Sequence, residues 1–175
     1  MAPKTGFTLV ELIAVVVVIG LLLVVVVPAA DRISPKYALR AAAREIGSGI
    51  ELARATAARS GRPAALLYEI DRRTYRLYAS PKPGEPQGDG PWGLSQAGPT
   101  RSLPAGIRFR GILPQGLRFM ESGELAVRFD PLSIDGSHIV YLENEQAKTI
   151  SVKYNALIGT ADYVDGTAEF EEVRY

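Results

Sequence analysis

Hydrophobic residues follow three successive patterns along this chain. Residues 7–27 form an apolar run in which Thr8 and Glu11 are the only clearly polar side chains. From residue 37 to residue 57, apolar residues recur every three or four positions, which is the spacing of one face of a helix. After Pro63 the period changes to two, as in strands that bury one face.

The first pattern predicts a transmembrane helix over residues 7–30. At a rise of about 1.5 Å per residue, the apolar run would span roughly 31 Å, close to the hydrocarbon thickness of a bilayer of about 30 Å. Its valine clusters disfavour a helix in water, but in lipid every backbone N–H and C=O must be satisfied within the segment. Pro28 is expected to kink this helix where it leaves the bilayer.

The second pattern predicts an amphipathic helix over residues 31–62. Ser60-Gly61-Arg62-Pro63 is a stop signal, with glycine placed for a C-cap and proline just beyond. Gly47 and Gly49 weaken the helix by about 1 kcal/mol each relative to alanine, and the pattern gives no reason for them. The apolar stripe is rich in alanine, which favours close packing against a sheet, and consists of Leu39, Ala42, Ala43, Ile46, Ile50, Ala53 and Ala57.

The third pattern predicts an antiparallel β domain over residues 63–175. The fold class is therefore α+β: a long N-terminal helix, half transmembrane and half amphipathic, packed on a β-sheet domain. Residues 80–101 are expected to form a long surface loop anchored by Trp92. The loop either makes contacts with other subunits or partners, or is a mobile insertion. Strands are expected at 64–70, 74–79, 103–109, 113–119, 125–129, 137–142, 148–154, 161–164 and 167–173, with 103–109 and 113–119 adjacent.

The start of the apolar run carries most of the functional information. A carboxylate such as Glu11 costs about 2.5–3.5 kcal/mol at the bilayer centre, so it requires a counter-charge. The leader before the run is short, residues 1–6, with one basic residue, Lys4. No cleavage site for a secretory signal peptidase follows the run. The small residue lies before it, at Gly6.

This junction resembles the class III signal of the type IV pilin and pseudopilin superfamily. Its pattern is a short basic leader, Gly, then Phe-Thr-Leu-x-Glu-Leu and an apolar helix, and this sequence reads Lys4-Thr5-Gly6-Phe7-Thr8-Leu9-Val10-Glu11-Leu12-Ile13. The resemblance implies that a prepilin peptidase cuts between Gly6 and Phe7 and that Phe7 is then N-methylated. It also implies that Glu11 faces the amine of a neighbouring subunit's Phe7 and sets the register of assembly.

The remainder of the chain resembles the H-type minor pseudopilins of type II secretion. Those proteins carry a Gly-Arg-Pro-like turn after the helix, an LPxGIRF strand, an F-x-P-x-G-S segment and a final TG hairpin. The last two matches are loose, because three extra residues interrupt the third and Ile-Gly replaces Thr-Gly in the fourth. The counterparts here are Gly61-Arg62-Pro63, Leu103 to Phe109, Phe129 to Ser137 and Ile158-Gly159-Thr160.

Composition narrows the chemistry. The 175 residues carry a net charge of +1, so no global field favours nucleic acid. The absence of cysteine excludes disulfides, thiolate metal sites and cysteine nucleophiles. It also favours the secretion relatives, because many type IV pilins of diderm bacteria close a C-terminal loop with a disulfide.

No catalytic or cofactor-binding motif is present in the sequence. The G-x-S-x-G, Walker and H-E-x-x-H patterns are all missing. His138 is expected to be a packed strand residue, and the pair Asp162 and Asp165 supplies too few oxygens to establish a calcium site. We therefore expect no enzyme activity, no cofactor and no metal. Outward arginines that could attract phosphate, although they are more often solvated or paired, are Arg108, Arg110 and Arg118.

The sequence favours a structural subunit of a periplasmic pseudopilus of the type II secretion system. Lys4 places the N-terminus in the cytoplasm, with a single span in the inner membrane and the C-terminal domain in the periplasm. The partners implied are prepilin peptidase, other pseudopilins and the inner-membrane secretion platform, with no nucleic acid expected. The alternatives are a minor type IV pilin in pilus assembly, adhesion or DNA uptake, and an unrelated single-pass anchored domain.

Mass spectrometry of the protein purified from its native membrane tests the processing site. We expect a mature chain that begins at Phe7 and carries one methyl group on its amine. A Gly6→Ala variant should retain leader residues 1–6, whereas Thr5→Ala, next to the junction, should be processed normally. A native chain that still begins at Met1 would contradict the assignment.

Overall fold

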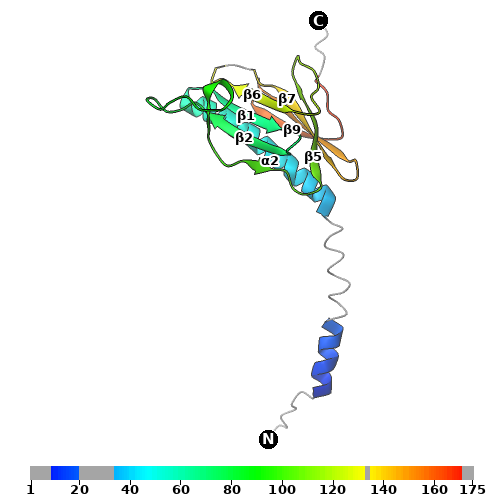
Figure 1. Cartoon of the computed structure of the whole chain (residues 1–175). Helices are drawn as coiled ribbons and strands as arrows, with labels where there is room; N and C mark the ends of the chain where they lie inside the picture. Colours follow the sequence, from blue (N-terminus) through cyan, green and yellow to red (C-terminus); the bar gives the residue numbers. More distant parts are fainter. Residues whose placement is uncertain (1–8, 20–33, 133–134, 171–175) are drawn as a thin grey trace. The chain divides into compact units, whose positions relative to one another are not determined.

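The computed structural model describes residues 9–19, 34–132 and 135–170. The chain divides into two compact units, Met1–Tyr37 and Ala38–Tyr175, and each is described by itself (Figure 1). In the first unit, residues 9–19 are helical. The helix α2 (Ser34–Ser60) begins at the end of the first unit and contributes one face to the core of the second.

The second unit consists of α2 and two antiparallel sheets. The first sheet, sheet A, has the order β3-β2-β1-β6, with β4 also paired to β2, and the second, sheet B, has the order β5-β7-β8-β9. The α+β class expected from the sequence is confirmed. The strands are β1 (Ala64–Glu69), β2 (Thr74–Ala79), β3 (Ser95–Gln96), β4 (Arg101–Ser102), β5 (Ile107–Pro114), β6 (Glu124–Phe129), β7 (His138–Asn144), β8 (Thr149–Asn155) and β9 (Thr160–Asp165).

The alanine-rich stripe of α2 lies in the main core. All seven residues of the predicted stripe are at most 5% exposed, and they pack with side chains from both sheets. Ile46 and Ile50 are fully buried, and each contributes about 1.5–3 kcal/mol relative to an exposed position. Gly61 follows the helix with φ +64°, which confirms the predicted glycine stop.

The two helix glycines that the sequence left unexplained lie under aromatic rings. A Cβ on Gly47 would overlap the phenol of Tyr163, which comes from β9. A Cβ on Gly49 would lie 3.2 Å from the ring of Tyr75, which comes from β2. The glycines therefore allow one side chain from each sheet to approach the helix backbone closely.

A cluster of aromatic side chains connects the two sheets. The Tyr68 hydroxyl of β1 lies 2.9 Å from His138 Nε2 of β7, and both side chains are fully buried. His138 Nδ1 lies 2.6 Å from the Gly136 carbonyl oxygen, so Nδ1 carries the proton and donates while Nε2 accepts from Tyr68. The rings of Phe129 and Tyr154 complete the cluster. The prediction that His138 is a packed strand residue is confirmed.

The 80–101 loop is attached to sheet A by two short strands. β3 pairs with Tyr78 and Ala79 at the end of β2, and β4 pairs with its start. Trp92 is 55% exposed, so the prediction that it anchors the loop is wrong. Leu94 anchors it instead, buried to 4% exposure against Ala65, Leu67 and Tyr78. Trp92 has φ +54°, inside the single turn η1 (Pro91–Gly93) that places Leu94.

The second of the two strands expected at 103–109 and 113–119 is absent from the described residues. β5 continues to Pro114, and the following Pro-Gln-Gly turn reverses the chain, with the Leu117 N–H donating to the Pro114 carbonyl at 3.2 Å. The returning segment forms only one bridge, between Ile112 and Met120. Leu117 and Phe119 are therefore 67% and 40% exposed, rather than buried as a strand pattern predicts.

The strand expected at 167–173 is also wrong over its described part, residues 167–170. These residues follow β9 without forming a ladder. Side chains hold them instead: the Ala168 N–H donates to Ser151 Oγ at 3.0 Å, and the Tyr141 hydroxyl donates to the Ala168 carbonyl at 2.6 Å. Residues 171–173 lie outside the described part of the chain.

A methyl group on Gly88 should loosen the 80–101 loop. A Cβ there would overlap the Leu94 carbonyl and lie 2.5 Å from Ser95 Cα, and backbone atoms cannot move aside cheaply. We expect Gly88→Ala to destabilise the closed loop by about 1–3 kcal/mol, and thus to speed its limited proteolysis by about tenfold. Gly98→Ala, where nothing lies within 4 Å, is the matched control. Equal cleavage rates for the two variants would contradict the close packing at Gly88.

Acidification should destabilise the aromatic cluster through His138. Burial lowers the pKa of His138 from 6.5 to about 4, so the unfolded chain binds the proton first as pH falls. The stabilisation is fully present above pH 6.5 and decreases by about 3 kcal/mol as pH falls to 4. Urea unfolding of the full chain in detergent, followed by circular dichroism, measures this. The free energy of unfolding of His138→Gln should depend less steeply on pH over this range. Equal slopes for the two proteins would refute the role of His138.

Candidate functional site

The described helical segment of residues 9–19 exposes an apolar surface. Its large hydrophobic side chains are 48–76% exposed within the chain. Residues 12–19 are all apolar. Eight consecutive apolar residues cover every side of a helix, so they do not form a single stripe. A helix that is hydrophobic on all sides is stable when lipid or other protein covers it.

Glu11 lies in the first turn of this segment and is exposed. Negative side chains near a helix N-terminus interact favourably with the helix dipole. Once apolar material surrounds the segment, however, the carboxylate requires a positive partner. The segment therefore combines an apolar surface with one acidic position, Glu11.

Other predicted site residues lie outside the described residues. These are Gly6 and Phe7 at the expected cleavage site and Pro28 at the expected kink, and they remain expectations. Among the described residues, no helix is both long and apolar enough to cross a membrane. The predicted transmembrane run extends past the described segment on both sides.

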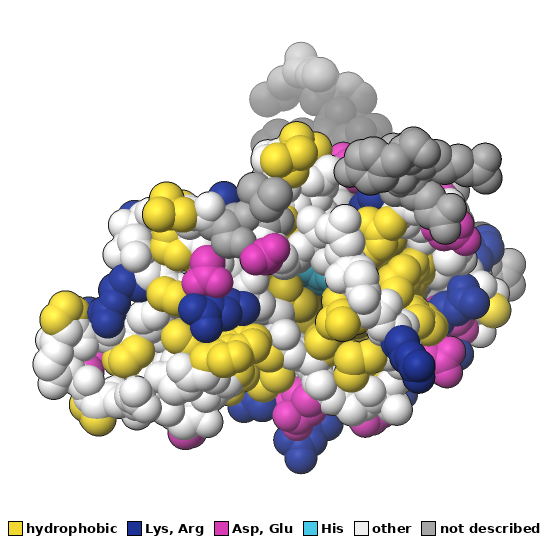
Figure 2. All heavy atoms as spheres, turned by 90° about the horizontal axis from the view of Figure 1, so that it is seen from above, with side chains coloured by type: hydrophobic (Ala, Val, Ile, Leu, Met, Phe, Trp, Pro, Cys, Tyr) yellow, Lys and Arg dark blue, Asp and Glu magenta, His cyan; other side chains and the backbone are white. Residues whose placement is uncertain are grey.

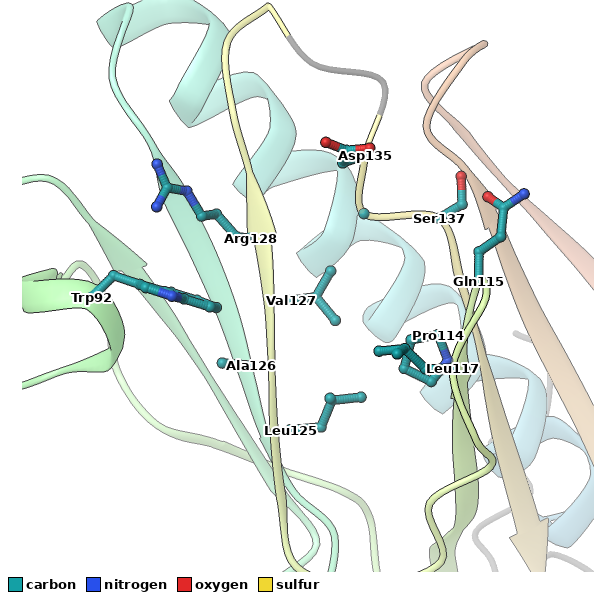
Figure 3. Close-up of a pocket in the computed structure, with 11 residues that line it drawn as sticks. Trp92, Pro114, Gln115, Leu117, Leu125, Ala126, Val127, Arg128, Asp135 and Ser137 are labelled. Carbon is teal, nitrogen blue, oxygen red and sulfur yellow. The ribbon is translucent and has the colours of Figure 1, made fainter.

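A cleft between the two sheets is a second candidate site. It has a volume of about 550 Å³ and lies between β6 and the end of β5, with Trp92 at its rim (Figure 3). Leu125 and Val127 point into it from β6, toward Pro114 and Leu117 on the opposite side. The sequence analysis missed this cleft, because its walls come from segments far apart in the sequence.

The polar groups at the cleft do not resemble a catalytic set. Arg128 is bonded to Asp130 at 2.9 Å, and its guanidinium lies 5.9 Å from the centre of the Trp92 ring. The Gln115 N–H donates to the Ser137 carbonyl at 2.9 Å. These groups shape the rim, while the walls below are mainly apolar. The cleft is better suited to binding a chain than to polarising a substrate.

Three of the residues considered for metal or phosphate, Asp165, Arg108 and Arg110, have side-chain contacts within the protein. Asp165 lies 2.6 Å from Arg40 of α2, and no cluster of three potential metal ligands occurs among the described residues. Arg108 forms a 2.8 Å ion pair with Glu143, and Arg110 contacts the Thr167 hydroxyl at 3.4 Å. On the face shown in Figure 2, acidic and basic side chains are interspersed. This face therefore has no extended positive electrostatic potential that would attract an anionic polymer such as nucleic acid.

Comparison with known proteins supports the N-terminal signal. Residues 1–27 match the family model described as the prokaryotic N-terminal methylation motif. No curated protein matches the chain. The motif covers the leader, the expected cleavage site and the apolar run with Glu11, and the folded unit carries a helix packed on antiparallel sheets. Residues 1–27 thus match the N-terminal methylation motif, while the rest of the chain lies outside that family model.

Among solved structures, the fold is similar to that of the minor pseudopilin EpsH from the type 2 secretion system of Vibrio cholerae. The TM-score is 0.50 at 11% sequence identity, and the match covers 73% of this chain and 96% of that one. The predicted resemblance to an H-type minor pseudopilin is confirmed at the level of the fold.

Proposed function

We propose that this chain is a structural subunit of a periplasmic pseudopilus of the type II secretion system. The observation that carries the proposal is the combination of the methylation motif over residues 1–27 with a pseudopilin-like fold. The subunit acts by assembly, not by catalysis. Its precursor is held in the inner membrane, with the N-terminus in the cytoplasm and the C-terminal domain in the periplasm.

In this proposal the apolar helix serves two environments in turn. Prepilin peptidase cuts between Gly6 and Phe7, and methylation of Phe7 follows. The helix then leaves the lipid and packs against the helices of other pseudopilins, on the inner-membrane secretion platform. The exposed apolar side chains of residues 9–19 support this, because both environments cover them without exposing them to water.

Glu11 sets the register in the proposed filament. Cleavage creates a new amine on Phe7, and a buried carboxylate is stable beside a cation but costly without one. Pairing of Glu11 with the Phe7 amine of the neighbouring subunit therefore favours one axial position over others. The charge contributes specificity more than affinity, since the apolar surface supplies the latter.

Substitution of Glu11 tests the proposal. Glu11→Ala should reduce recovery of the protein in the pseudopilus fraction by at least about tenfold, because an unpaired buried amine costs about 3–5 kcal/mol. Leader cleavage, measured by mass spectrometry, should remain normal. Glu11→Gln, which keeps the shape without the charge, should be equally impaired, and Glu11→Asp should retain part of the function. Normal co-purification of Glu11→Ala with its partner pseudopilins would exclude this role.

A further inference from the structure

The outer edge of β6 forms one wall of the cleft between the sheets. β6 pairs with β1 along its whole length, from Ala64 opposite Phe129 to Glu69 opposite Glu124. The strand order places β6 at the end of sheet A. Within the described residues, no strand pairs with its other edge.

The register shows which backbone groups face the cleft. The Ile70 N–H donates to the Gly123 carbonyl at 3.0 Å, which extends the β1–β6 pairing by one residue. Hydrogen-bonded and non-hydrogen-bonded pairs alternate in an antiparallel ladder, so the backbone groups of Leu125 and Val127 form hydrogen bonds with β1. The residues between and beside them, Glu124, Ala126 and Arg128, direct their N–H and C=O groups away from β1. A Cβ on Gly136 would lie 3.0 Å from the Arg128 carbonyl oxygen, so Gly136 covers the edge at Arg128 and the open part of the edge runs over Glu124 and Ala126.

The other strand edges among the described residues differ from the edge of β6. On the far side of sheet A, β3 and β4 pair with β2. At the edge of sheet B, β5 has a register shift between Phe109 and Gly111, and Ile112 is bridged by Met120. β9 is also an end strand, but among the described residues the cleft beside β6 is lined by β6 and not by β9. β6 has a continuous register and no proline, so it can accept another strand.

The cleft provides an apolar space beside this edge. Side chains of an added strand alternate between its two faces. Those on the inner face would lie beside Leu125 and Val127 and opposite Pro114 and Leu117 (Figure 3). Val127 is 7% exposed, whereas Leu117 is 67% exposed and would gain most from being covered.

The charges at the edge favour a basic residue at one end. Glu124 is exposed and directly opposite Glu69, a like charge that destabilises the pair. Arg76 and Arg72 neutralise Glu69, at 2.8 and 3.1 Å. No described ion pair involves Glu124. At the other end of β6, Arg128 already forms an ion pair with Asp130. An added strand would therefore carry its complementary charge, a positive one, opposite Glu124.

We propose that β6 accepts an extended segment of a partner protein as an additional antiparallel strand of sheet A. The segment has the order apolar-x-apolar-basic, with apolar residues opposite Val127 and Leu125 and Lys or Arg opposite Glu124. Every strand pair in both sheets is antiparallel, and the added strand continues that pattern. Backbone hydrogen bonds supply affinity, while the cleft and Glu124 select the sequence. The inference depends on the cleft and not on the proposed filament.

Binding of a synthetic peptide, Ser-Thr-Val-Thr-Val-Lys-Ser, to the full chain in detergent tests the inference. At millimolar peptide, hydrogen exchange at the amides of Glu124 and Ala126 should slow by about tenfold, and Trp92 fluorescence should change. The matched peptide with Glu in place of Lys should bind about fivefold more weakly. Absence of amide protection at this peptide concentration would overturn the inference.

Edge variants separate strand addition from other binding. Ala126→Pro removes an N–H that points away from β1, so it should abolish protection without weakening the β1–β6 ladder. Ala126→Val keeps the N–H and should bind normally. Glu124→Lys should reverse the preference between the two peptides. Unchanged binding by Ala126→Pro, or an unchanged preference in Glu124→Lys, would refute strand addition. Glu11→Ala leaves the cleft intact, so failure of this test and failure of the proposed function are distinguishable.

Discussion

The close approach of two sheets to one helix is the constraint on which the folded unit depends. α2 presents alanine at four of its seven buried stripe positions, and two glycines allow aromatic rings to reach its backbone. Larger residues would hold the sheets farther away, and the Tyr68–His138 hydrogen bond between them could not form at 2.9 Å. Sheet packing, the neutral state of His138 and the cleft between β5 and β6 all follow from this spacing.

Much of the fold could be predicted from the sequence because its signals are local. The helical stripe, the stop at Gly61 and the first hairpin each depend on spacing within one segment. The errors arose where partners distant in sequence decide the structure. Residues 117–119 have the alternation of a strand, but the turn at Pro114 directs them back along β5, where only one bridge forms. Leu94 anchors its loop in place of Trp92, because it is Leu94 that packs against Ala65, Leu67 and Tyr78 of the distant strands β1 and β2.

The two candidate sites also differ in whether their residues are neighbours in the sequence. The N-terminal signal is contiguous, so the expectations for Gly6, Phe7 and Glu11 come from the order of residues alone. The cleft combines residues near 92, 115, 127 and 136, and no periodicity links them. The open edge of β6 depends on which residues bond to β1, and this is fixed only once the register is known. A strand pattern indicates which side chains are buried but not which of its edges is free.

The way in which α2 is attached to the sheets makes the resistance of the folded unit to force depend on the direction of the force. Contacts between the helix and the sheets are spread along its length: Arg40 to Asp165, Glu45 to Arg101, and Arg54 to the Asp130 carbonyl. A pull along the helix axis would load these contacts and the buried stripe together, so they must rupture at once. A sideways pull would peel them one after another. The unit is thus built to resist tension along α2 better than bending across it.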